Sequence, residues 1–174
     1  MTKVRHKVFI SFYHKDDQKY KDYIHKYLCE DLIDKSVSDG EYDSELADNY
    51  VKRLIREDKI TDSSVIVVLV GLNTYKRKHV DWEIYAGLKE SINGRSALIG
   101  ILMPEIPISN NNEYSLDYLP IRLADNVKSG YAKIYAWNYA KEHFYEIVDE
   151  AFNEKTIKKD DADNSRLQMQ VNLW

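Results

Sequence analysis

The sequence predicts a three-layer α/β fold, in which helices flank both faces of a central five-stranded parallel sheet. Two observations indicate this class. Short β-rich runs alternate with longer segments of helical periodicity, and two of these runs are apolar throughout, as expected for strands buried on both faces. Repeated strand–helix order implies right-handed crossovers and therefore parallel strands. The 174 residues suit one domain, which we expect to span residues 1–153.

The alternation begins with residues 7–12, KVFISF, a β-branched apolar run that predicts the first strand. Residues 14–32 follow with tyrosine, isoleucine and leucine side chains at 3.6-residue spacing, so they predict an amphipathic helix. Asp16 or Asp17 is a suitable N-cap for this helix, because its carboxylate can accept a free backbone N–H of the first turn.

The middle of the chain is expected to contain the centre of the sheet. Residues 35–43 predict a weak second strand with a turn at Asp39-Gly40, and residues 44–58 have one apolar face, which predicts a second helix. Residues 63–71, SSVIVVLVG, are the central buried strand.

A third helix should contain Glu83, because Val80, Ile84 and Leu88 recur at i, i+4 and i+8 on one apolar face with Glu83 at its edge. The next buried strand, residues 96–104, ends at Pro104.

The last part of the chain is less regular before it returns to the same pattern. Residues 105–130 should be mostly loop, with a short helix in 115–124, and residues 132–137 and 139–152 predict the fifth strand and last helix. Residues 154–174 are polar and predict a flexible tail, with docking of LQMQVNLW on the domain or on a partner as the alternative.

Ligands of open parallel sheets bind at the carboxyl ends of the strands, so the loops after the first three strands are the segments of interest. These loops bring together hydroxyl, aromatic and basic side chains near Glu83, a combination that suits a dinucleotide. The basic cluster lies near a helix N-terminus, which favours phosphate. The alternative is that KRK is a solvated loop and Glu83 a surface residue. The side chains concerned are Ser11, Phe12, Tyr13, Asp39, Tyr42, Asp43, Lys76, Arg77, Lys78 and His79.

Composition excludes several other classes of protein. The net charge of −4, with interspersed signs, argues against a nucleic-acid partner. Apolar runs are too short to cross a bilayer and there is no signal-peptide core, so we expect no membrane partner and a cytoplasmic location. The single Cys29 permits no internal disulfide and is expected to be a small core residue, the alternative being a thiolate paired with His25.

Known catalytic motifs are also missing. The sequence has neither phosphate-loop motif and no G-x-S-x-G, and its five histidines show no metal-ligand spacing, so no metal and no bound cofactor are expected. Asp16 and Asp17 could belong to a receiver-like phosphotransfer site, but Lys141 lies too far beyond the fifth strand for the lysine of such a site.

Two stretches carry a resemblance to a known family. KVFISFYHKDD resembles the first-strand signature of TIR domains, and DSSVIVVLVGLNTYKRKHVDWEIYAGL resembles their third strand, loop and catalytic helix. More narrowly, the chain is similar to the TIR-like ThsB proteins of bacterial Thoeris anti-phage defence, over about residues 5–153. It departs from the TIR pattern where tryptophan often stands four residues before the glutamate, because His79 occupies that position and Trp82 adjoins Glu83.

The resemblance implies a flavodoxin-like TIR fold and an NAD-processing enzyme, a NAD glycohydrolase or ADP-ribosyl cyclase, with NAD as substrate and Glu83 as catalytic carboxylate. It further implies an ADP-ribose-derived, cyclic messenger that activates a separate effector, and self-association through TIR–TIR contacts. The implied substrate-binding residues are Ser11, Phe12, Tyr13, Asp39, Asp43, Lys76, Arg77 and His79. A non-enzymatic TIR scaffold that acts through homotypic contacts is the alternative.

Overall fold

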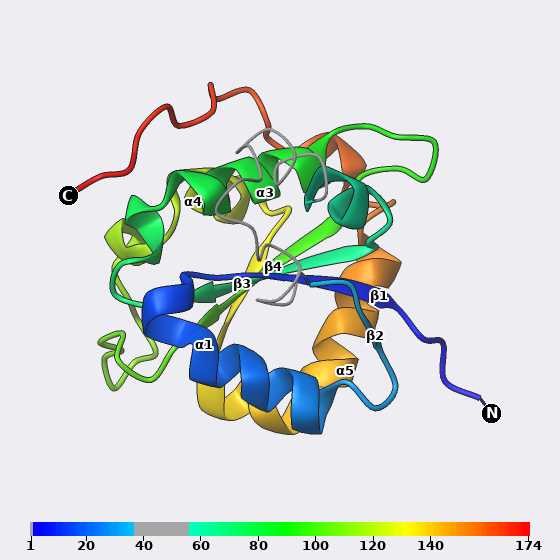
Figure 1. Ribbon diagram of the computed structural model, residues 1–174, viewed down its shortest axis with the longest axis horizontal. Coiled ribbons are helices and arrows are strands. Elements are labelled where there is room, and N and C mark those ends of the chain that lie inside the picture. Colours follow the sequence, from blue (N-terminus) through cyan, green and yellow to red (C-terminus); the bar gives the residue numbers. More distant parts are fainter. Residues whose placement is uncertain (1, 37–55) are drawn as a thin grey trace, which may run out of the picture.

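The computed structural model describes residues 2–36 and 56–174, and within them a five-stranded parallel sheet forms the middle layer (Figure 1). The strand order β2-β1-β3-β4-β5 is that of flavodoxin-like folds, so the predicted fold class is confirmed. The strands are β1 (Lys7–Ser11), β2 (Ile33–Asp34), β3 (Val65–Val70), β4 (Ala97–Leu102) and β5 (Lys133–Ala136).

Helices cover both faces of the sheet. Helices α1 and α5 lie on one face, and α3 and α4 lie on the other (Figure 1). The helices are α1 (His14–Tyr23), continued by a π-helical segment (Ile24–Leu28), then α3 (Lys78–Leu88), α4 (Ile121–Ser129) and α5 (Trp137–Glu154). Short 3₁₀ helices span Thr74–Lys76, Leu116–Tyr118 and Lys159–Asp161, and residues 56–61 are also helical.

Successive side chains of each strand point to opposite faces of the sheet, and this divides the core into two halves. In β3 every residue is buried, with Val65, Val67 and Leu69 facing α1 and α5. Ile66, Val68 and Val70 face α3 and α4. A strand that buries both faces must be apolar throughout, which is why this run could be assigned to the sheet centre from its sequence.

The second strand differs from its prediction. It spans Ile33–Asp34 rather than residues 35–43, because Ile33 pairs with Lys7 and Asp34 with Val8 of β1. Leu32, immediately before it, is buried in the core. The remainder of the predicted strand lies outside the described residues, as does most of the predicted helix 44–58.

Two further expectations need correction. Asp16 and Asp17 do not cap α1: Tyr13 holds the N-cap position, and both aspartates lie in the first turn with their N–H groups donating to the Tyr13 carbonyl. The chain enters this helix almost directly from β1, so the cap falls earlier than expected. The region 105–130 also contains helix α4, which begins at Ile121 and ends at Ser129, later than the short helix predicted within 115–124.

Beyond α5 the chain turns back across the α3 and α4 layer and runs along those two helices (Figure 1). The sequence predicted a flexible tail for residues 154–174 with docking as the alternative, and these hydrogen bonds correspond to docking on the domain, while the domain division at residue 153 stays a prediction. Within the described ranges, no helix is both long and apolar enough to span a bilayer.

Candidate functional site

The candidate site lies at the carboxyl ends of β1 and β3. These strands are neighbours in the sheet, but β1 leads into α1 on one face and β3 leads towards α3 on the other. Such a point, where successive connections diverge to opposite faces, is where flavodoxin-like sheets bind ligands.

Glu83 lies in the middle of α3 and is buried, with 5% of the residue exposed. The apolar stripe of Val80, Ile84 and Leu88 holds α3 against the sheet, and Glu83 stands beside that stripe on the side of β1. Burial raises the pKa of this carboxyl, because the charged form loses hydration; Arg56, Ser11 and His14 act in the opposite direction. The alternative of a surface carboxylate is therefore wrong for Glu83.

Arg56 supplies the positive charge that faces this carboxylate. Its guanidinium Nη1 lies 3.7 Å from Glu83 Oε1, and the side chains are 25% and 6% exposed. Arg56 comes from the helical residues that precede β3, whereas Ser11 ends β1 and His14 begins α1. Three separate segments thus converge on one buried acid.

Ser11 is fully buried at the end of β1, where it pairs with Val68 of β3. Its hydroxyl lies close enough to Glu83 to lower the pKa of that carboxyl, yet Oγ makes no hydrogen bond of ordinary geometry among the described residues. The buried Ser11 hydroxyl and the buried Glu83 carboxylate beside it can therefore both form further hydrogen bonds.

His79 stands one turn before Glu83 on α3 and is linked to β1. Its Nε2 lies 3.0 Å from the Phe12 carbonyl oxygen, which can only accept, so Nε2 carries the proton and Nδ1 is an acceptor. Burial lowers the pKa of His79 to about 4, so the ring is neutral near pH 7. The Phe12 ring lies 4.2 Å from that of His14 and belongs to the core.

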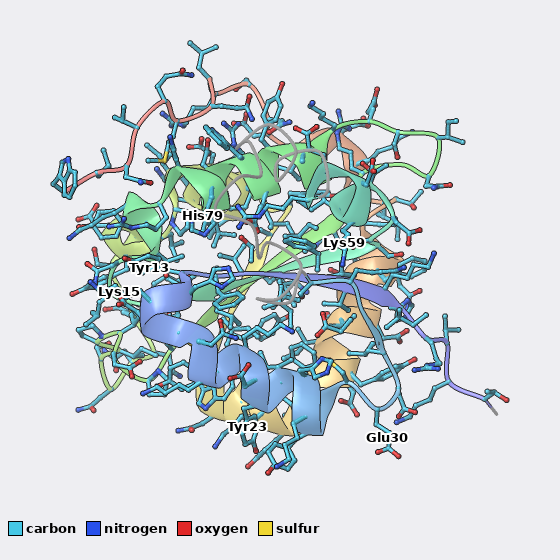
Figure 2. The ribbon with its side chains drawn as sticks, in the orientation of Figure 1. Tyr13, Lys15, Tyr23, Glu30, Lys59 and His79 are labelled. Atoms are coloured by element: carbon cyan, nitrogen blue, oxygen red, sulfur yellow. The ribbon has the colours of Figure 1, made fainter. Side chains whose placement is uncertain are left out.

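Tyr13 and Arg77 form a second pair at the same edge. The Arg77 guanidinium carbon lies 4.4 Å from the centre of the Tyr13 ring, a cation–π geometry. Arg77 Nε is buried and makes no hydrogen bond within the described part of the chain. In Figure 2, Tyr13 and His79 lie at the same end of the molecule, at the starts of α1 and α3.

Lys76 stands apart from this group. Its carbonyl oxygen accepts the Leu173 N–H at 2.9 Å, and its Nζ lies 5.6 Å from the ring centre of Tyr75. The structure therefore brings Ser11, Tyr13, Arg77 and His79 towards Glu83 and leaves Lys76 beside the returning chain. Asp39 and Asp43, with Tyr42, lie outside the described residues.

Arg56 and His14 are the site residues that sequence reasoning missed. Arg56 was one of several basic residues in a predicted amphipathic helix, and no local signal distinguishes it from Arg53. His14 had a signal, because it follows Ser11, Phe12 and Tyr13 directly. Across residues 2–36 and 56–174, no group of three or more His, Cys, Asp or Glu side chains is placed to hold a metal ion.

The arrangement as a whole offers a buried, hydrogen-bonding carboxylate whose charge Arg56 stabilises, beside a neutral imidazole. It suits the stabilisation of positive charge that develops on a bound molecule. Among family models, that of the Thoeris protein ThsB, TIR-like domain, matches residues 9–107, more than half of the chain and the whole of the described site. Comparison with curated proteins gives no match.

Proposed function

Since the chain belongs to the TIR-like domain family of the Thoeris protein ThsB, we propose that it is an NAD-cleaving enzyme of anti-phage defence. It breaks the bond between nicotinamide and ribose. The observation that carries the proposal is the buried Glu83 carboxylate at the β1–β3 edge, with a raised pKa and with Arg56 and Ser11 beside it.

The chemistry of NAD matches what such a carboxylate provides. Nicotinamide is already a cationic leaving group, so cleavage needs no strong general acid; it needs stabilisation of the oxocarbenium-like C1′ that forms as the bonding electrons depart with the ring. Glu83 supplies negative charge at that centre and accepts hydrogen bonds from ribose hydroxyls. Burial strengthens this interaction because water does not screen it.

Neighbouring side chains have supporting roles in the proposal. Arg56 keeps Glu83 ionised against the cost of burial, and Ser11 positions ribose, a role that the resemblance also assigns to Asp39 and Asp43. Arg77, whose Nε makes no hydrogen bond within the described residues, meets the pyrophosphate, whose oxygens suit an Arg fork. Lys76, which lies beside the returning chain, is assigned to the pyrophosphate by the resemblance alone. Tyr13 and His79 flank a ring of the dinucleotide, with Phe12 supporting them from the core.

The group that attacks C1′ decides the product. Water gives ADP-ribose and a proton, whereas attack by a hydroxyl or ring nitrogen of the same molecule gives a cyclic isomer. We propose the cyclic type, acting as a diffusible messenger on a separate effector in the cytoplasm, with self-association of the domain completing the site.

The test compares nucleotide extracts of phage-infected cells that express the native chain, Glu83→Gln or Glu90→Gln. Gln keeps the size of Glu83 and removes its charge, and Glu90 is a matched control because its side chain is 78% exposed. We expect an ADP-ribose-related species, or NAD loss, with the native chain and Glu90→Gln but not with Glu83→Gln. If all three extracts match while the native chain still protects the cells, the domain is a scaffold.

A further inference from the structure

Residues 163–173, named the strap here, run along the side of α3 that faces away from the candidate site (Figure 1). Glu83 on α3 faces Arg56 and Ser11. Asp81 and Trp82, the two residues before it, bond instead to the strap. The same short helix therefore meets the site on one side and the strap on the other.

Asn172 of the strap caps the N-terminus of α3. The position before the helix, Arg77, offers no side-chain cap, so the first backbone N–H groups need partners from elsewhere. The N–H of Lys78, the first residue of α3, donates to Asn172 Oδ1 at 2.9 Å. Beside it, the Leu173 N–H donates to the Lys76 carbonyl at 2.9 Å.

Met169 binds α3 through both of its backbone polar groups. Its N–H donates to Asp81 Oδ2 at 2.8 Å, and its carbonyl accepts from Trp82 Nε1 at 2.7 Å. These contacts hold two successive residues of the helix directly before Glu83. They fix both the rotation of α3 and its position along its axis.

A buried ion pair anchors the strap between α3 and α4. Arg122 of α4 is 0% exposed and Asp81 is 1% exposed, with Nε to Oδ1 at 2.9 Å. The same guanidinium donates to Asn164 Oδ1 at 3.1 Å and to the Leu167 carbonyl at 3.2 Å. One cation thus joins the catalytic helix to two points of the strap.

We propose that the strap positions the catalytic carboxylate, with Asn172 and the Met169 backbone as positioning groups that act through α3. The inference rests on the proposed function of Glu83. Catalysis depends on holding a charge within a fraction of an ångström of the reacting centre, and a short helix that frays at its first turn does not hold its fifth and sixth residues in place.

The test uses the full chain and three substitutions. Asn172→Ala removes the cap, Asn172→Asp keeps an acceptor oxygen and adds a charge that suits a helix N-terminus, and Gln170→Ala is a control at an exposed strap position. Trp82→Phe, which removes the Nε1–H donor to Met169 together with part of the ring, is the second variant should Asn172→Ala fail to fold.

The first measurement is hydrogen exchange of the peptide that covers the start of α3. Loss of an N-cap should speed exchange of its first-turn amides roughly five-fold in Asn172→Ala. Asn172→Asp and Gln170→Ala should exchange as the native chain does. Unchanged exchange in Asn172→Ala overturns the proposal whether or not the chain cleaves NAD.

The second measurement is nicotinamide release from added NAD in lysates of phage-infected cells. We expect kcat of Asn172→Ala to fall at least about five-fold with KM unchanged, and Asn172→Asp to retain native kcat. Faster exchange with native kcat in Asn172→Ala refutes the positioning role. No release by the native chain refutes the proposed function instead, and the exchange data distinguish these two failures.

Discussion

Removal of the buried Arg122 charge should destabilise the protein more than any change at an exposed ion pair. In Arg122→Met, the Asp81 carboxylate stays buried with the Met169 N–H as its one remaining donor among the contacts described. Breaking a buried pair from one side costs about 3–5 kcal/mol, because the other charge is left uncompensated. For a domain of this length, that corresponds to a fall in Tm of roughly 6–20 °C.

Urea denaturation followed by circular dichroism measures this loss, with two comparisons. Arg166→Met removes a partly exposed pair with Asp125 and should cost no more than about 1 kcal/mol. Asp81→Asn combined with Arg122→Met removes the stranded charge and keeps an acceptor for Met169, so it should recover part of the stability. If Arg122→Met loses no more than Arg166→Met, the reasoning about this anchor is wrong.

Three further predictions concern groups outside the strap. Gly71→Ala should destabilise the fold by about 1–3 kcal/mol in urea titrations, because the new Cβ would overlap the Asp17 carboxylate; an equal loss in an Asp17→Ala background would contradict this. Burial raises the pKa of Asp17 from 3.8 to about 6, so the unfolded chain ionises first as pH rises. Native stability relative to Asp17→Asn should therefore fall between pH 4 and 6, and a difference that is flat or rises with pH would refute the assignment. Burial likewise raises the pKa of Cys29 from 9.0 to about 12, so iodoacetamide at pH 8 should modify the folded chain more slowly than the urea-unfolded chain by a factor on the order of 10³, and rates within ten-fold of each other would count against it.

The parts of the fold that follow from sequence are those held by apolar burial. The runs that became β3 and β4 are buried at every position, so their hydropathy alone indicates central strands. Helix α4 was underestimated because Arg122 and Asn126 occupy fully buried positions, which breaks the apolar pattern. Their burial depends on partners in the strap, about 40 residues later in the chain.

The strap is a second case in which contacts between polar residues could not be predicted from the sequence. Its composition is polar, and hydropathy predicts flexibility for such a segment. In the structure its polar groups meet polar groups on α3 and α4, as Asn164 meets Arg122 and Asp163 meets Asn126. Hydrogen bonds between distant polar residues leave no periodic signal in either segment.

Only part of the candidate site could be predicted from the sequence, for a similar reason. Glu83 was singled out by its place after a buried strand and by the family resemblance, and the structure adds that it is buried. Its partner Arg56 lies 27 positions earlier in a different helical segment, and only the folded arrangement joins the two at 3.7 Å.

The most direct test of the central claim follows the bond that Glu83 is proposed to break. Lysates of phage-infected cells expressing the native chain, Glu83→Gln, Glu90→Gln or no added protein receive NAD labelled in its nicotinamide ring, and release of labelled nicotinamide is timed. Loss of one stabilising charge should slow release about 10²–10³-fold in Glu83→Gln, down to the rate without added protein, while Glu90→Gln keeps the native rate. Equal release by Glu83→Gln and the native chain would show that Glu83 is not the catalytic carboxylate.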